Sequence, residues 1–227
     1  MTSEKKITLL LNSIPQFLQE KNGRAWDQVC EFYHANDSAW ANAGCPWSET
    51  FVESLFAIWS RSDFVRDMSI RYPSWLSGYA EEKSPLYSNR NIADYRASLS
   101  ESMSGLEDEL AFMAAIRVFR QREMLRIVWR DLMRMSDFHQ TAREVSDLAD
   151  VCVSVALEYA HKTLSARYGR PMSATQPRCE QEMLVIAMGK HGGCELNVSS
   201  DIDLILIYPE SGETEHPRKS IDNHAFF

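Results

Sequence analysis

Two aspartates separated by one residue, Asp201 and Asp203, are the side chains in this sequence best suited to chemistry. They fall at the start of a predicted strand, Ile202 to Tyr208, and the period of two in a strand places both carboxylates on the same face. Two like charges this close repel each other unless a divalent cation lies between them. The pair therefore predicts half of a Mg²⁺ site that could bridge nucleotide phosphates, although a bare Asp-x-Asp is also common on solvated strand edges.

A glycine-rich segment precedes the aspartates and follows a second apolar run, Met183 to Met188, which has the length of a strand. Glycines permit a tight turn and a close approach of phosphate, and Glu195 and Leu196 suggest a short helix whose N-terminus would favour an anion. Lysine adds a compact positive charge, and serine hydroxyls can donate to phosphate oxygens. The predicted phosphate-binding residues are Gly189, Lys190, Gly192, Gly193, Ser199 and Ser200.

Two further features allow a functional and a structural interpretation. His191 lies in the glycine-rich turn and either carries protons or is incidental. Four arginines spaced four residues apart form one helical stripe, which either faces a bound phosphate or is a solvated face with weak ion pairs. The stripe consists of Arg122, Arg126, Arg130 and Arg134.

The elements that must position this motif are mostly helices. Glycine is sparse before residue 170, and no alternation typical of strands persists there. Pro15 is predicted to interrupt the opening amphipathic segment, Ile7 to Leu18, and Ser62 to precede a further helix. Gly169 and Pro171 are predicted to end the last long helix. The six tryptophans are expected to pack between helices rather than to stack on bases. The predicted organisation is a helical region (1–104), a long helical pair (105–170), a linker (171–180) and a strand-turn-strand unit (181–227), which together indicate an α/β or α+β catalytic unit.

Composition restricts the class of protein. The 24 basic and 32 acidic residues give a net charge of −8, which is unfavourable for binding a nucleic-acid backbone. Five scattered cysteines without CxxC spacing predict free thiols in a reducing cytoplasm rather than disulfides or structural zinc. No apolar run reaches the ~18 residues of a membrane span, and the N-terminal segment makes a poor secretory signal. We therefore expect a cytoplasmic protein that binds neither membranes nor nucleic acid.

The run GKHGGCELNVSSDIDLILIYPESGET, which starts at Gly189, closely resembles the nucleotidyltransferase signature of the glutamine synthetase adenylyltransferase family. Similar segments are Ser62 to Leu76, Phe119 to Leu132 and Ser220 to Phe227. The resemblance implies a polymerase-beta-type α/β nucleotidyltransferase domain after the helical region. It also implies that Asp201 and Asp203 match the acidic pair that binds Mg²⁺.

The resemblance further implies a function. Enzymes of this family have two nucleotidyltransferase halves: one attaches AMP from ATP to a tyrosine of glutamine synthetase, and the other removes it by phosphorolysis, releasing ADP. A PII-type signalling protein sets the direction. The long helical region before the motif indicates the N-terminal, deadenylylating half.

This chain departs from the family signature at three points. His191 stands where leucine is usual, and Cys194 stands where arginine is usual, which removes a cation from the phosphate side. The family also has a third carboxylate on a later strand, and the present sequence extends only to Phe227, before that strand. We therefore expect an incomplete catalytic domain and an isolated chain with little or no activity.

Two other function classes remain open. The chain could be a helical docking module, without catalysis of its own, that binds glutamine synthetase or a PII-type regulator. A nucleic-acid nucleotidyltransferase of the same superfold is the third alternative, and the acidic composition argues against it.

Overall fold

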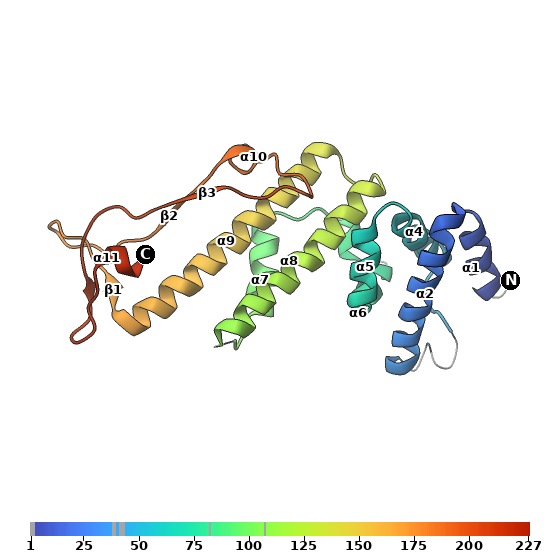
Figure 1. Cartoon of the computed structure of the whole chain (residues 1–227), viewed down its shortest axis with the longest axis horizontal. Coiled ribbons are helices and arrows are strands. Elements are labelled where there is room, and N and C mark those ends of the chain that lie inside the picture. Colours follow the sequence, from blue (N-terminus) through green and yellow to red (C-terminus); the bar gives the residue numbers. More distant parts are fainter. Residues whose placement is uncertain (1–2, 38–39, 41–43, 82, 107) are drawn as a thin grey trace. The chain divides into compact units, whose positions relative to one another are not determined.

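The computed structural model describes residues 3–37, 40, 44–81, 83–106 and 108–227. The protein is mostly helical, with a few short antiparallel strands near its C-terminal end (Figure 1). Its chain forms two compact units. Unit 1 comprises Met1–Asn89 and Met113–Thr141, and unit 2 comprises Arg90–Phe112 and Ala142–Phe227, so the division falls within the long helices α8 and α9.

Unit 1 is built from helices whose starts follow local rules. Pro15 interrupts the first amphipathic segment as predicted, because a helix interior does not accept proline. Ser48 and Ser62 each accept a hydrogen bond from the backbone N–H three residues further along the chain. They thereby cap the N-termini of the helices that begin at Glu49 and Asp63. The elements of unit 1 are α1 (Ser3–Asn12), α2 (Gln16–Asn36), α4 (Glu49–Trp59), α5 (Asp63–Arg71), α6 (Ser74–Ala80), the 3-10 turn η1 (Pro85–Tyr87) and most of α8 (Glu109–Leu132).

Aromatic side chains dominate the core of unit 1. Trp59 and Trp129 are buried, and their indole N–H groups donate to Ser69 and Ser54, each over 3.1 Å. Burying an indole without a partner for its N–H would cost free energy, and these serines avoid that cost by accepting the hydrogen bond. The prediction that the tryptophans pack between helices is confirmed, since all six lie in or against this core: Trp26, Trp40, Trp47, Trp59, Trp75 and Trp129.

The arginine stripe is buried at its centre and exposed at its two ends, Arg122 and Arg134. The solvated-face interpretation is therefore wrong for the central pair. Arg126 and Arg130 are buried within unit 1. Arg126 donates to Glu123 over 2.9 Å and to the carbonyl of Ser88 over 3.2 Å, and Arg130 donates to the carbonyl of Leu86. Their role in unit 1 is to satisfy carbonyls within η1 and directly after it, as guanidinium groups with several donors can.

Unit 2 rests on α9 (Phe138–Tyr168), against which α7 (Ile92–Ser102) packs. Tyr95 of α7 donates to Glu144 over 3.2 Å, and Arg96 of α7 pairs with Glu158 over 2.8 Å. Gly169 ends α9 with a positive φ of 85°, so the predicted glycine cap is confirmed.

Two pairs of antiparallel strands complete unit 2. The strands β1 (Arg170–Pro171) and β4 (Thr214–Glu215) pair with each other, so the predicted linker contributes its first residue to a strand. The two predicted apolar strands also pair, as β2 (Leu184–Ala187) and β3 (Leu204–Ile207), in the register Leu184–Ile207 to Ala187–Leu204. Each is shorter than predicted. The short helices α10 (Gly189–Gly192) and α11 (Asn223–Phe226) complete the fold.

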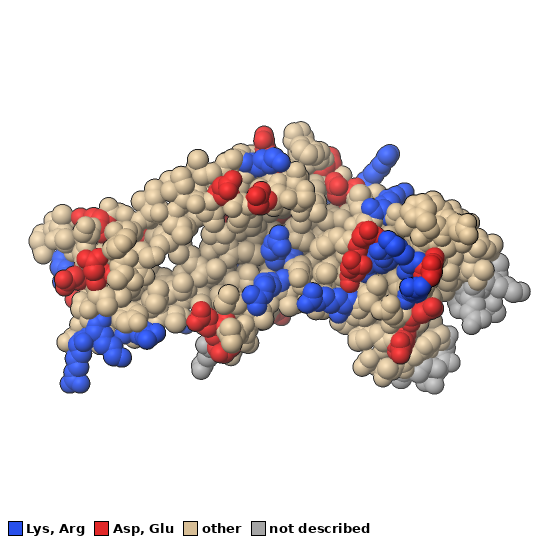
Figure 2. Space-filling view, viewed as in Figure 1, with Lys and Arg blue, Asp and Glu red and all other residues tan. Residues whose placement is uncertain are grey.

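The surface and the thiols agree with the composition. Basic and acidic side chains are interspersed on the face shown in Figure 2. All five cysteines are free thiols, as predicted, and burial, with Cys45 and Asp27 nearby, raises the pKa of Cys30 to about 12. Within the described parts of the chain, none of the helices combines the length and the apolar character that crossing a membrane requires.

Candidate functional site

The two aspartates lie immediately before β3 rather than inside it. Asp201, Ile202 and Asp203 precede Leu204, where the strand begins, and both carboxylates are exposed. The carbonyl of Asp203 accepts a hydrogen bond from the N–H of Met188 over 2.9 Å. That bond closes the loop of residues 188–203, called the site loop below, and brings the start of α10 next to the aspartates. The carboxylates thus lie at the end of the β2–β3 pair that the site loop connects, and because they are exposed a cation has access to them from solvent.

The glycines of the site loop have different structural roles. Gly189 adopts a positive φ of 55°, in which a side chain would be strained. A Cβ on Gly192 would lie 2.6 Å from the carbonyl oxygen of Ala187, so only glycine allows α10 to approach the end of β2. Gly193 has neither constraint, since its nearest neighbour would be the flexible side chain of Glu195 at 3.5 Å.

The short helix predicted after the glycines is wrong in position. The helical turn is α10 itself, on the glycines, and Glu195 and Leu196 follow it in irregular backbone. Four residues make too short a helix for a substantial macrodipole. Anion binding at the site loop therefore depends on individual N–H groups, hydroxyls and Lys190 rather than on a helix N-terminus.

Asn197 organises the two serines, and the sequence interpretation did not identify it. Its Oδ1 accepts from the hydroxyl of Ser199 over 3.1 Å and from the hydroxyl of Ser200 over 2.9 Å. The N–H of Ser199 also donates to the same oxygen over 3.1 Å, which makes an Asx turn. An asparagine two residues before a serine is a recognisable turn signal, so this residue could have been found. Both hydroxyls would have to turn away from Asn197 to donate to a phosphate.

The charges of the site loop oppose the binding of a bare anion. One lysine, Lys190, stands against three carboxylates, those of Glu195, Asp201 and Asp203. A phosphate placed there would meet a net negative environment unless a divalent cation accompanied it. The loop is therefore better suited to a metal-phosphate pair than to phosphate alone.

The ligands available for a metal are two carboxylates. Among the residues that the structure describes, no group of three or more histidine, cysteine, aspartate or glutamate side chains could hold a metal ion. Two carboxylates nevertheless suit Mg²⁺, which usually retains several waters and is completed by substrate phosphates. The donor set at Asp201 and Asp203 fits that pattern.

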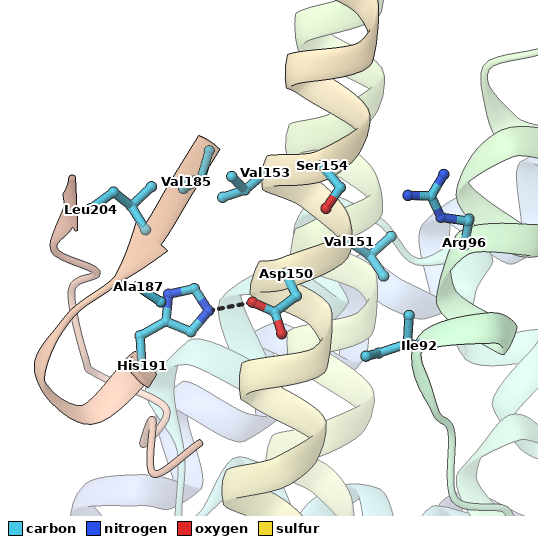
Figure 3. Close-up of a pocket in the computed structure, with 10 residues that line it drawn as sticks. All are labelled: Ile92, Arg96, Asp150, Val151, Val153, Ser154, Val185, Ala187, His191 and Leu204. Carbon is cyan, nitrogen blue, oxygen red and sulfur yellow. Dashed lines mark hydrogen bonds and ion pairs between the residues drawn. The ribbon is translucent and has the colours of Figure 1, made fainter. Parts of the chain in front are cut away.

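The site loop is attached to α9 at two points. His191, which the sequence left as either a proton carrier or incidental, is buried, and its Nε2 lies 2.8 Å from Oδ1 of Asp150 (Figure 3). The N–H of Leu196 donates to Oγ of buried Ser146 over 3.4 Å. Neither Asp150 nor Ser146 was predicted from the sequence, because each lies over 40 residues from its partner and shows no local signal.

A pocket of about 310 Å³ adjoins His191 and Asp150 within unit 2. Figure 3 shows Val185 and Leu204 of the strands facing α9, with Arg96 of α7 on the other side of that helix. On α9, burial raises the pKa of Asp147, the carboxyl of Asp150 adds to the rise, and Arg143 opposes it. The remaining residues that line the pocket are Ile92, Val151, Val153, Ser154 and Ala187.

Comparison with known proteins places these features in a family. The family model described as glutamate-ammonia ligase adenylyltransferase matches residues 52–227. A bifunctional glutamine synthetase adenylyltransferase/adenylyl-removing enzyme of Hahella chejuensis is 36% identical over 217 residues, which is 96% of this chain and 21% of that protein. Proteins of the same name are 35% identical in Nitrosococcus oceani, over 96% of this chain and 22% of that protein, and 38% identical in Pseudomonas aeruginosa, over 80% of this chain and 18% of that protein. The chain thus spans about a fifth of the length of these curated relatives.

Proposed function

The chain belongs to the glutamate-ammonia ligase adenylyltransferase family, and we propose that its site loop is the metal- and phosphate-binding part of a nucleotidyl-transfer site. Glutamate-ammonia ligase is glutamine synthetase, which the names of the relatives give as the protein acted upon. We propose the N-terminal, deadenylylating half of such an enzyme, with a polymerase-beta-type catalytic fold. Its partners would be adenylylated glutamine synthetase, phosphate, ATP or ADP and a PII-type regulator in the cytoplasm.

One observation carries the proposal: the bond between Met188 and Asp203 brings the glycine turn next to the acidic pair. In this proposal Asp201 and Asp203 hold Mg²⁺, which when bound would neutralise charge on the phosphodiester and the attacking phosphate. Lys190 and the hydroxyls of Ser199 and Ser200 orient phosphate oxygens. The glycines at positions 189, 192 and 193 let the phosphate approach the backbone.

The reaction that fits these roles is an in-line displacement at the AMP phosphorus. A phosphate oxygen attacks that phosphorus, the bond to the tyrosine oxygen breaks, and the products are ADP and the free tyrosine hydroxyl. The contribution of the chain is to position the reactants and to supply compensating charge, which accounts for most of catalysis in phosphoryl transfer. With only two carboxylates, we expect the chain alone to turn over slowly or not at all.

A binding experiment tests the proposal without requiring turnover. The chain is immobilised and presented with adenylylated or unmodified glutamine synthetase, with and without Mg²⁺. We expect Mg²⁺ to favour the adenylylated form, and we expect the combined Asp201→Asn and Asp203→Asn variant to lose that preference. The matched control is Glu210→Gln, an acidic residue outside the site loop, which should retain it.

The docking-module alternative makes the opposite prediction. If both forms of glutamine synthetase bind equally, and the double aspartate variant binds as the wild type does, the chain is a docking module and the metal-phosphate proposal fails. Rapid phosphorolysis by the chain alone, abolished by Asp203→Ala, would support the site but refute the expected inactivity. Retention of RNA at low salt would favour the nucleic-acid alternative.

A further inference from the structure

We propose that Asp150 and His191 form a clasp that positions the site loop on α9, which makes both of them positioning residues for the metal-phosphate site. The inference rests on the proposed function of that loop. It assigns a role to a histidine that stands where leucine is usual in the signature this chain resembles.

The geometry of the pair indicates a directed bond rather than general packing. The side chain of His191 is 3% exposed, whereas that of Asp150 is 46% exposed, and 2.8 Å separates Nε2 from Oδ1. Among the described residues, the buried Nδ1 of His191 has no hydrogen-bond partner. A proton on Nδ1 would be buried without an acceptor, so the neutral ring carries its proton on Nε2 and donates it to the carboxylate.

A second contact extends the clasp along the loop. Ser146 lies one helical turn before Asp150 and therefore on the same face of α9. Its hydroxyl donates to the carbonyl of Ala142 over 2.8 Å and accepts from the N–H of Leu196 over 3.4 Å. The first half of the site loop is thus held at His191 and Leu196. The proposed phosphate-binding glycines and Lys190 lie beside His191, and the two serines and two aspartates follow Leu196.

The segment between the two contacts is ordered by short-range bonds that report on it. The N–H of Cys194 donates to the carbonyl of His191 over 3.0 Å, and the N–H of Glu195 donates to the carbonyl of Lys190 over 2.7 Å. If the clasp holds α10 in place, these amides exchange with solvent slowly. If the clasp breaks, α10 can move away from α9, and the exchange becomes faster.

Substitutions at position 191 separate the bond from the packing. His191→Leu fills the space beside Val185 and Ala187, which line the same pocket, with an apolar side chain that cannot form the hydrogen bond. The half-exposed Asp150 is then solvated by water. His191→Gln places an amide N–H near the position of Nε2 and can donate to Asp150 again. Asp147→Asn is the matched control on α9, because Asp147 is also a carboxylate but is not the partner of His191.

The experiment measures amide exchange by NMR and Mn²⁺ affinity, in the presence of phosphate, for the full chain. In His191→Leu and Asp150→Ala, we expect exchange at Cys194 and Glu195 to accelerate at least tenfold and the Kd for Mn²⁺ to rise by roughly tenfold, as for other groups that orient metal ligands. His191→Gln should restore both values to within about threefold, and Asp147→Asn should change neither. Nitrogen shifts of His191 should show the tautomer protonated at Nε2.

Wild-type values in His191→Leu, or a tautomer protonated at Nδ1, would overturn the clasp. If exchange accelerates while the Mn²⁺ affinity is unchanged, the bond holds the loop but does not position the site, and the inference also fails. If the wild-type chain does not bind Mn²⁺ at all, the proposed function fails, and the exchange data alone then decide whether the clasp holds the loop.

Discussion

Apolar side chains are buried in the core of unit 1, whereas many of those in the β2–β3 pair of unit 2 are exposed. In unit 1 the large apolar residues of α4 are buried, and Leu55 has no exposed surface. In the β2–β3 pair one face consists of Leu184, Ile186, Ile205 and Ile207, and all four are exposed. An isolated two-stranded sheet has only marginal stability, and these side chains contribute little of the burial that stabilises a core.

Stability and the proposed function therefore depend on different parts of this chain. A core of buried aromatic side chains stabilises unit 1, and the indole N–H groups of Trp59 and Trp129 are hydrogen-bonded within it. The site loop lies between two strands with little buried surface, so its geometry depends on a few directed contacts to α9. Small changes in the loop should therefore alter ligand binding more than global stability.

The largest effect we predict separates the two regions with one type of substitution. Leu55→Ala removes a fully buried side chain and should lower the free energy of unfolding by about 2–5 kcal/mol. Leu184→Ala removes a side chain that is 56% exposed and should cost less than ~0.5 kcal/mol. Urea unfolding followed by tryptophan fluorescence and circular dichroism measures both free energies, and equal losses would contradict the contrast between the two regions.

The second prediction separates two glycines of the site loop. Gly192→Ala forces a Cβ against the carbonyl oxygen of Ala187 and should destabilise the contact between α10 and β2 by about 1–3 kcal/mol. Gly193→Ala meets only a flexible side chain and should be neutral or slightly stabilising. Amide exchange in α10 and β2 measures the difference, and faster exchange in both variants would contradict these distinct roles.

The third prediction concerns Cys194, which adopts a positive φ of 56°. Glycine accepts this conformation without strain, but it loses more conformational entropy on folding than cysteine, which offsets part of the gain. Cys194→Gly should therefore stabilise the loop by about 0.5–1 kcal/mol. Cys152→Gly, in the middle of α9, is the matched control and should destabilise the protein. A destabilising Cys194→Gly would show that this thiol makes contacts that outweigh the strain.

The smallest effect depends on pH. Because burial raises the pKa of Asp147 above its ordinary value of 3.8, the ionised carboxylate costs stability above its folded-state pKa. Asp147→Asn should therefore raise the free energy of unfolding at pH 7, and this gain should shrink as the pH falls through the folded-state pKa toward the unfolded value. Urea titrations between pH 4 and 8 measure it, and a gain independent of pH would exclude this cause.

Local features of the fold could be predicted from the sequence. Pro15, Ser62 and Gly169 act on residues within one helical turn, and the structure has helix boundaries at all three. The two apolar runs were recognisable as strands, although Asp201 and Asp203 fall outside the second one. A strand boundary depends on pairing with another strand, which spacing alone does not fix.

Long-range features could not be predicted in the same way. The burial of Arg126 and Arg130 depends on carbonyls about 40 residues away, so a helical spacing of four looked like a solvated stripe. The bond from His191 to Asp150 likewise depends on how α9 lies beside β2. Such contacts follow from tertiary packing, for which the local pattern has no signal.

A titration of the full chain with Mn²⁺ in the presence of phosphate tests whether the site loop binds a metal-phosphate pair. We predict paramagnetic broadening centred on the amides of residues 199–205 in the wild type. In Asp203→Asn the binding should weaken by at least tenfold, since one of the two proposed carboxylate ligands is lost. Broadening centred elsewhere, or equal binding by Asp203→Asn and the wild type, would contradict a metal-phosphate site at this loop.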